Sequence, residues 1–158
     1  MAEEATPRTP LVDEQATRYV ESTLSFPMED LVSFPKYIFV ETTNHCNARC
    51  IMCAIDFDHP QRKPTTMSDD LFQKIVLELS DHRDTVEKLM LYLDCEPLVD
   101  RGLHQRVRRA KESGIRKVNI ATNASLLTET RSLELIDAGL DEIYITVDSL
   151  DKDRFETI

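Results

Sequence analysis

Four short apolar runs recur along the chain, and a stretch that contains a helical pattern separates each run from the next. The runs occupy residues 37–40, 89–93, 118–120 and 143–145. The first run indicates a buried strand, and the second shows no alternation of apolar and polar positions, as expected for a strand covered on both faces in a parallel sheet. The order of strands and helices predicts an α/β fold with right-handed crossovers and a curved sheet that closes toward a barrel.

Two of the intervening segments carry helix signals. Ser68 precedes Asp69 and Asp70, so a capping hydroxyl and two carboxylates stand at the positive end of a helix dipole. The apolar stripe of this predicted helix consists of Leu71, Phe72, Ile75, Val76 and Leu79. A second helix is predicted over residues 103–113, and Gly114 ends it.

A short pattern occurs twice in the second half of the chain. In residues 114–120 and again in residues 139–145, a glycine is followed by two charged residues and the start of an apolar run. We interpret each glycine as the end of a helix and each run as the start of a strand. Two successive helix–strand units are therefore built alike.

The two ends of the chain differ from the middle. Residues 1–35 hold four prolines, many charges and only a weak helical pattern over residues 14–24, so we predict an N-terminal extension. The core domain is predicted over residues 36–158. Because residues 151–158 begin a helix without a stop signal, we expect this core to be incomplete at its C-terminus, with about four βα units.

Composition excludes several classes of function. The formal net charge of −10 argues against a nucleic-acid partner, since phosphate binding needs a basic surface. Only three glycines occur, too few for a Walker or Rossmann loop. Carboxylates interrupt the N-terminal residues, and no apolar run is long enough for a signal peptide or a membrane span, so we expect a cytoplasmic protein with reduced thiols. The basic stretch is interpreted as a solvent-exposed helix face: Arg106, Arg108, Arg109 and Lys111.

Three of the four cysteines, Cys46, Cys50 and Cys53, fall within eight residues. Three thiolates this close can hold one four-iron cluster, and three protein ligands leave one iron open for another molecule. A structural zinc site with His45 or His59 as fourth ligand is an alternative, although zinc ligands usually come in two separated pairs. A disulfide framework is disfavoured because nothing indicates secretion.

Polar residues follow each predicted strand. The cysteine loop follows the first strand, residues 94–97 follow the second, residues 122–123 follow the third, and residues 146–149 follow the fourth. In a parallel sheet the carboxyl ends of the strands lie at one rim, which is where such folds place their chemistry. We therefore expect all four segments to contribute to one site.

The spacing of the cysteines, with three residues and then two between them after a strand, resembles the radical S-adenosylmethionine (radical SAM) superfamily. The resemblance implies a barrel of six βα units, of which about four are present here. It also implies a [4Fe-4S] cluster held by Cys46, Cys50 and Cys53, with S-adenosyl-L-methionine (SAM) on the open iron. Electron transfer from a reductant such as flavodoxin or ferredoxin would then release a 5′-deoxyadenosyl radical that abstracts hydrogen from a substrate.

The resemblance extends to the other strand ends. Residues 94–97, Asp-Cys-Glu-Pro, stand where the family commonly has Gly-Gly-Glu-Pro, and we interpret Cys95 as a small residue in place of glycine. Glu96 would accept from the ammonium group of SAM, or alternatively be a solvated turn carboxylate. The residues that the resemblance assigns to SAM are Met52, Asp94, Cys95, Glu96, Asn123, Thr146 and Asp148.

The segments after the second and fourth strands look most like the branch of the family with a C-terminal SPASM or twitch domain. That branch modifies peptides, sugars or aminocyclitols, so the resemblance implies a small-molecule or peptide substrate. The rival interpretation is a non-catalytic metal-binding module that keeps the cysteine loop without turnover.

Overall fold

The computed structural model describes residues 18–19, 22, 34–53 and 63–158. By its internal contacts the chain divides into two units, Met1–Phe34 and Pro35–Ile158. In the first unit Arg18, Tyr19 and Ser22 are helical, and the Ser22 hydroxyl donates to the carbonyl of Tyr19 (2.8 Å). The rest of the helical pattern predicted over residues 14–24 lies outside the described residues.

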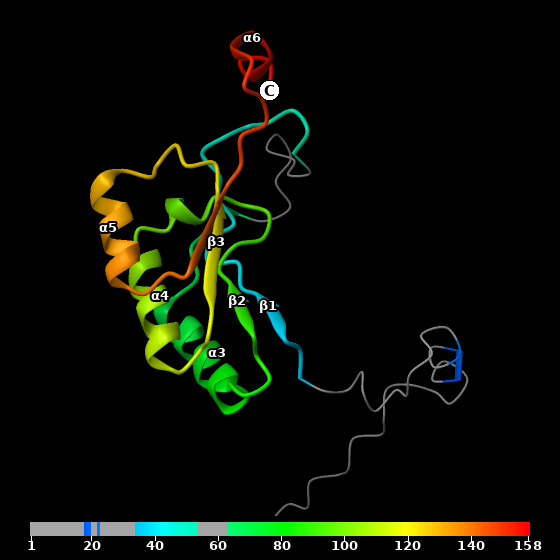
Figure 1. The fold of residues 1–158 in the computed structure, drawn as a ribbon, viewed down its shortest axis with the longest axis vertical. Helices are drawn as coiled ribbons and strands as arrows, with labels where there is room; N and C mark the ends of the chain where they lie inside the picture. Colours follow the sequence, from blue (N-terminus) through cyan, green and yellow to red (C-terminus); the bar gives the residue numbers. More distant parts are fainter. Residues whose placement is uncertain (1–17, 20–21, 23–33, 54–62) are drawn as a thin grey trace, which may run out of the picture. The chain divides into compact units, whose positions relative to one another are not determined.

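The second unit is built on four parallel strands in the order β1-β2-β3-β4 (Figure 1). The strands are β1 (Tyr37–Phe39), β2 (Lys88–Met90), β3 (Val118–Thr122) and β4 (Glu142–Ile145). The four parallel strands predicted from the apolar runs are therefore confirmed, although β1 and β2 end earlier than the runs do.

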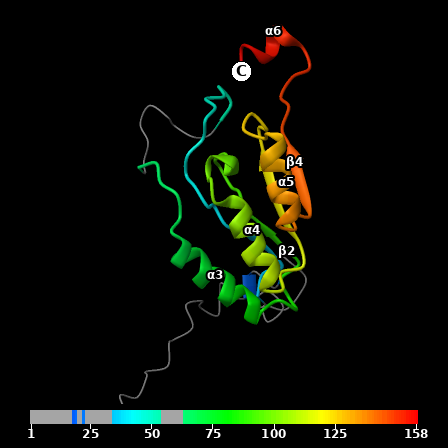
Figure 2. The ribbon, with the colours of Figure 1, turned by 90° about the vertical axis from the view of Figure 1, so that its left-hand side faces the viewer.

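Three helices cover one face of this sheet (Figure 2). They are α3 (Asp69–Asp81), α4 (Leu103–Glu112) and α5 (Glu129–Asp137), and α4 contacts both of the others. A 3₁₀ turn, η1 (Pro97–Val99), follows β2, and the short α6 (Lys152–Phe155) follows β4. Within the described residues, no helix combines the length and the apolar character that a membrane crossing needs.

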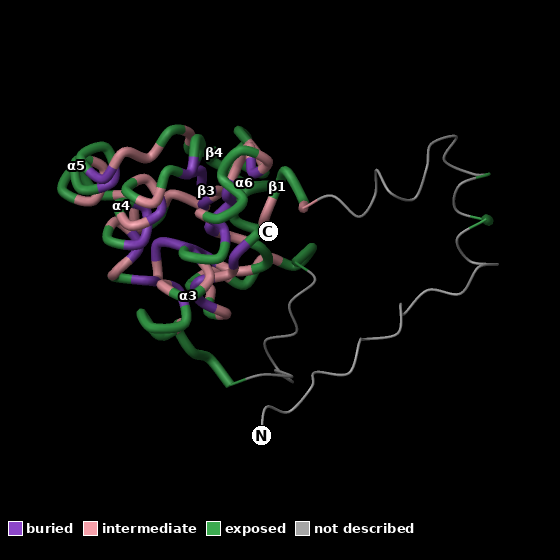
Figure 3. Tube along the Cα trace, turned by 90° about the horizontal axis from the view of Figure 1, so that it is seen from below, coloured by how far each residue is buried: buried purple, intermediate pink, exposed green. Residues whose placement is uncertain are grey.

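The core lies between the sheet and the helices, where buried segments gather in Figure 3. Alternate strand residues face the helices and are fully buried, among them Leu89, Val118 and Ile120. From the helices, Phe72 and Val107 fill the space opposite them. Burial of large apolar side chains of this kind is the main stabilising contribution of the fold.

The opposite face of the sheet is open in the described part of the chain. Tyr37 is 59% and Phe39 51% exposed, so the expectation that the first strand is buried is wrong here. The reason is that all three covering helices lie on one side. On the open face, Lys88 and Glu142 form an ion pair across β3 (2.6 Å), and the Tyr92 ring meets Phe39 edge to face.

The predicted helix ends are confirmed. The Ser68 hydroxyl caps α3 by accepting from the amide of Leu71 (3.3 Å). Gly114 and Gly139 both have φ of +88°, the left-handed conformation that glycine adopts at least cost, and each ends a helix just before a strand. Leu71, in contrast, is 48% exposed, so the predicted apolar stripe is narrower than the sequence indicated.

Arg106 departs from the sequence prediction. It was expected on a solvated helix face, but it is only 3% exposed. Its Nε donates to Asp100 (2.7 Å), an Nη donates to the carbonyl of Met67, and the guanidinium lies 5.1 Å from the centre of the Phe72 ring. Burial is possible because the charge is paired and hydrogen-bonded, which is the condition for placing an ion in a core.

Candidate metal and cofactor site

The cysteine loop leaves the sheet at the end of β1 and is closed at its base. Thr43 and Thr66 form an antiparallel bridge, and the amide of Met67 donates to the carbonyl of Thr42 (2.7 Å). The Asn44 carboxamide accepts from the amide of Thr65 (2.6 Å). Because both strands of the base are hydrogen-bonded together, the loop starts and ends at one fixed place on the rim of the sheet.

All three loop cysteines carry free thiols; Cys46 and Cys50 are half-buried and Cys53 is exposed. The amide of Cys53 donates to the carbonyl of Cys50 (3.0 Å), which folds this part of the loop into a turn. Burial raises the pKa of the Cys46 thiol, the amide of Ala48 partly opposes the rise, and the nearby Glu96 charge adds to it. The first cysteine therefore lies close to the carboxylate that follows β2.

The donor set suits a four-iron cluster, since three thiols on one short loop can serve three irons and leave the fourth open. Within the described residues, no three His, Cys, Asp or Glu side chains are grouped so that they could hold a metal ion. His59, the alternative zinc ligand, lies outside the described residues. The assignment of Cys46, Cys50 and Cys53 as ligands stays a prediction from the sequence.

Glu96 lies at the predicted rim but is not solvated, because it is only 3% exposed. One carboxylate oxygen accepts from the amide of Leu98 (2.9 Å) and from the Thr122 hydroxyl (2.6 Å). The other oxygen accepts from the amide of Asn123 (2.8 Å). The interpretation as a solvated turn carboxylate is therefore wrong, and Glu96 ties the end of β2 to the end of β3.

Cys95 stands beside Glu96 and is half-buried. Burial raises the pKa of its thiol to about 12, and the neighbouring Glu41 carboxylate contributes through its charge and a hydrogen bond. Cys95 is thus a neutral thiol that donates to Glu41, a residue at the end of β1. A glycine at this position would offer no such contact, so the substitution adds a link between two strand ends.

The remaining predicted SAM residues are spread around the same rim. Met52 is 58% exposed, and Asp94 and Asp148 are exposed as well. The Thr146 hydroxyl donates to the carbonyl of Thr122 (3.3 Å), and the Asn123 carboxamide donates to Asn47 (3.1 Å). The structure therefore brings Cys46, Glu96 and Asn123 together and leaves the exposed residues free to meet a ligand from solvent.

The sequence patterns did not assign three further residues of the rim to the site: Glu41, Asn47 and Ser125. Each has a local signal, since Glu41 comes directly after the first apolar run and Asn47 directly after Cys46. Ser125 stands two residues beyond Asn123 in the turn after β3. Their partners lie on distant segments, which a strand-by-strand inspection of the sequence cannot supply.

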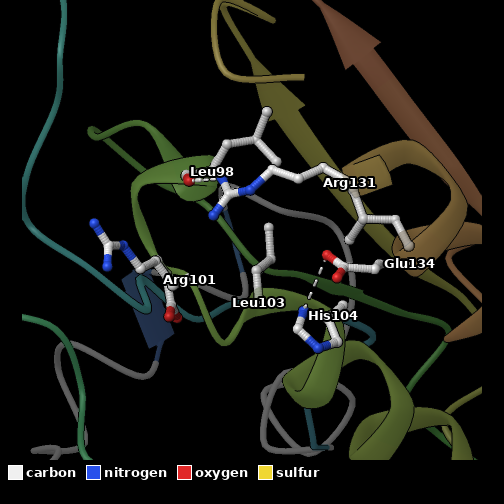
Figure 4. A pocket seen from close by; sticks show the side chains of 8 residues that line it. Leu98, Arg101, Leu103, His104, Arg131 and Glu134 are labelled. Carbon is white, nitrogen blue, oxygen red and sulfur yellow. Dashed lines mark hydrogen bonds and ion pairs between the residues drawn. The ribbon is translucent and has the colours of Figure 1, made fainter. Parts of the chain in front are cut away.

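A small pocket on the helical side is not part of this site (Figure 4). Arg131 donates to the carbonyl of Leu98, and His104 pairs with Glu134 at 3.8 Å. Its volume is about 10 Å³, and one water needs roughly 10–15 Å³. The pocket therefore has room for about one water and serves the packing of α4 against α5.

Comparison with known proteins identifies the family. The model of the radical SAM superfamily matches residues 40–158, which include the cysteine loop and the strands β2, β3 and β4. The chain belongs to the radical SAM superfamily, a family of enzymes whose members use a [4Fe-4S] cluster and SAM.

Two relatives show the breadth of this family. The chain is 36% identical over 117 residues to a "tungsten-containing aldehyde ferredoxin oxidoreductase cofactor-modifying protein" of Pyrococcus furiosus, covering 73% of this chain and 31% of the relative. It is 31% identical over 124 residues to a GTP 3′,8-cyclase of Peptoclostridium acidaminophilum, covering 77% of this chain and 37% of the relative. The chain thus spans about a third of the length of these curated relatives.

Solved structures agree on the fold. BtrN in complex with AdoMet and 2-DOIA superposes with a TM-score of 0.66 at 24% identity, covering 77% of this chain and 50% of BtrN. An open conformation of BtrN gives a TM-score of 0.62 at 26% identity, covering 78% of this chain and 54% of that structure. The four parallel strands described here are therefore part of a radical SAM barrel, as the sequence predicted.

Proposed function

We propose that this chain is part of a radical SAM enzyme that binds one four-iron cluster through Cys46, Cys50 and Cys53. The observation that carries the proposal is the position of the cysteine loop. The loop leaves the end of β1, and Glu96 at the end of β2 lies near Cys46. A loop of three thiols beside a buried carboxylate suits a cluster whose open iron holds an amino acid.

A bound cluster would supply the electron that cleaves SAM and starts hydrogen abstraction from the substrate. The chain's own residues would hold SAM in place. Glu96 has both oxygens engaged by protein donors, yet a carboxylate offers about four lone-pair sites, so one remains to accept from the SAM ammonium group. Met52 would offer an apolar surface to adenine, and Thr146 and Asp148 would lie near the ribose and the methionine carboxylate.

The proposal extends to partners and location. A flavodoxin or ferredoxin would supply electrons, and the protein would be cytoplasmic and independent of nucleic acid and membranes. The substrate would be a peptide, a sugar or an aminocyclitol, as in the branch with a SPASM or twitch domain. The two relatives named above act on a nucleotide and on the cofactor of a tungsten enzyme, according to their names, so the family accommodates varied substrates.

The test is SAM cleavage by the full-length protein that carries this segment. After anaerobic reconstitution with iron and sulfide and reduction with dithionite, we expect 5′-deoxyadenosine and methionine by liquid chromatography. Single Ala variants at Cys46, Cys50 or Cys53 should bind less iron and form neither product, whereas Cys95→Ala should keep the cluster. A colourless protein that binds one zinc would instead support the non-catalytic module and contradict the proposal.

A further inference from the structure

Three polar side chains, none of them a proposed ligand of the cluster, join the cysteine loop to the turn after β3. The Asn47 carboxamide nitrogen donates to the Ser125 hydroxyl (2.7 Å), and the Asn123 carboxamide nitrogen donates to the side-chain oxygen Oδ1 of Asn47 (3.1 Å). The Ser125 hydroxyl in turn donates to the side-chain oxygen Oδ1 of Asn123 (2.7 Å). Each of the three side chains therefore bonds to the other two.

A second contact fixes the loop on the other side of Cys46. The amide of Glu96 donates to the carbonyl of His45 (3.2 Å). Since His45 and Asn47 are the two neighbours of Cys46 in the chain, the first cysteine is attached on both sides. One attachment runs to the end of β2 and the other to the turn after β3.

The turn after β3 is itself held rigidly. Its first residue, Thr122, donates to Glu96 and accepts from the amide of Ala124 (3.0 Å). Ala124 has φ of +58°, a conformation that residues other than glycine rarely adopt and that persists only where the surroundings enforce it. The amide of Ser125 donates to the Asn123 carboxamide oxygen (3.0 Å), so the position of Ser125 is fixed while this turn is intact.

We propose that Asn47, Asn123 and Ser125 form a latch that positions Cys46 against the ends of β2 and β3. Asn47 and Ser125 are positioning residues and hold no ligand themselves, whereas Asn123 is also a proposed SAM contact. Because Glu96 and Asn123 stand at those strand ends, the latch would fix the distance between the cluster and the proposed SAM contacts. This inference rests on the proposed function and deepens it.

The first test uses the cluster-free chain, so it does not depend on iron. Asn47→Ala and Ser125→Ala should each raise hydrogen exchange of the amides in residues 46–49 by about three- to tenfold, the range expected for one or two exposed hydrogen bonds. Ser125→Thr keeps the hydroxyl and should restore wild-type exchange. Ser113→Ala is the matched control, because it removes one serine hydroxyl bond of similar length (2.8 Å) at the end of α4.

The second test separates positioning from mere folding of the loop. In reconstituted protein, Asn47→Ala and Ser125→Ala should bind wild-type amounts of iron but lose it to a chelator about three- to tenfold faster. Their electron paramagnetic resonance (EPR) signal in the presence of SAM should also differ from wild type. The double variant should be no worse than either single one, because one network is broken in each case.

The outcomes are distinct. The latch is overturned if the amides of residues 46–49 exchange at the wild-type rate in both latch variants. It is also overturned if Ser113→Ala raises exchange of these amides by the same factor. If the latch variants exchange faster but lose iron to the chelator at the wild-type rate and keep the wild-type EPR signal with SAM, the positioning role is overturned. If the latch variants exchange faster but the wild-type chain never binds iron, the latch is supported as an anchor of the loop and the proposed function is overturned instead.

Discussion

At the scale of single residues, the site depends on how each carboxylate and thiol is paired. Glu96 accepts three hydrogen bonds from protein groups while almost fully buried. Three donors from two strand ends hold this carboxylate in one orientation. It can therefore present its remaining lone pair to a cation in a fixed direction.

Substitution of Glu96 tests that role. In Glu96→Gln one accepting oxygen becomes an NH₂ group, which cannot accept from the neighbouring donors. A charge-assisted hydrogen bond contributes about 1.5–3 kcal/mol, so SAM binding should weaken by about ten- to a hundredfold while iron binding is kept. Anaerobic titration of the reconstituted protein measures this, with the exposed Glu112→Gln as control. Unchanged SAM affinity would show that Glu96 serves only to join the strand ends.

Cys95 makes a second prediction at this scale. With a pKa of about 12, its thiol is neutral near neutral pH, and its thiolate fraction rises about tenfold for each pH unit. A more basic thiolate is also more nucleophilic, which recovers part of the loss. Iodoacetamide at about pH 8.5 should therefore modify Cys95 of the cluster-free chain roughly thirty- to sixtyfold more slowly than a free cysteine.

Peptide mass spectrometry over a pH series gives the rate at Cys95. Glu41→Gln removes the neighbouring negative charge, which lowers the pKa of the thiol, so alkylation should become faster in that variant. Alkylation of Cys95 at the rate of a free cysteine, with no effect of Glu41→Gln, would contradict the contact.

At the scale of elements, the buried pair between Asp100 and Arg106 connects α4 to the segment that follows the cysteine loop. Asp100 precedes α4, and Arg106 reaches from α4 to the carbonyl of Met67. Met67 in turn donates to Thr42 at the base of the loop. The helix layer therefore supports the site through one guanidinium.

Removal of the Asp100 carboxylate should destabilise the fold. Among the described residues, Asp100→Ala leaves the buried Arg106 charge with the exposed Asp69 as its remaining acidic partner (3.3 Å), so we expect a loss of about 3 kcal/mol in the free energy of unfolding. Urea unfolding followed by circular dichroism measures it. The exposed Asp84→Ala serves as control, and an equal, small change in both variants would contradict the account.

Much of the element order could be predicted from the sequence. Apolar runs, the Ser68 cap and the paired glycines at 114 and 139 are local signals, and each gave the correct element. Arg106 and Leu71 could not be placed correctly, because their burial depends on partners that lie far away in the chain. For the same reason the sequence indicated Glu96 but not its link to Thr122.

At the scale of the whole molecule, the sheet is open at β4 within the described part of the chain. β4 pairs with β3 alone, and its residues Ile143, Tyr144 and Ile145 are 38%, 48% and 51% exposed. Unpaired strand edges with apolar side chains promote association. The 158-residue chain should therefore associate with rising concentration and bind a hydrophobic dye.

Sedimentation velocity over a concentration series tests this prediction. Ile145→Lys places a charge at the open edge and should shift the chain toward monomer without lowering its helix content. A chain that stays monomeric at all concentrations and binds no dye would contradict it. We further expect the isolated chain to bind the cluster, because all three cysteines lie in one loop, but not to turn over a substrate.

The central claim is that one cluster in this loop binds SAM directly, and EPR spectroscopy of the reconstituted, dithionite-reduced chain tests it most directly. The account predicts the signal of a reduced four-iron cluster that changes shape when SAM is added. It also predicts no such signal in Cys46→Ala, Cys50→Ala or Cys53→Ala, and an unaltered one in Cys95→Ala. A cluster signal that SAM leaves unchanged, or one that persists without the loop cysteines, would contradict it.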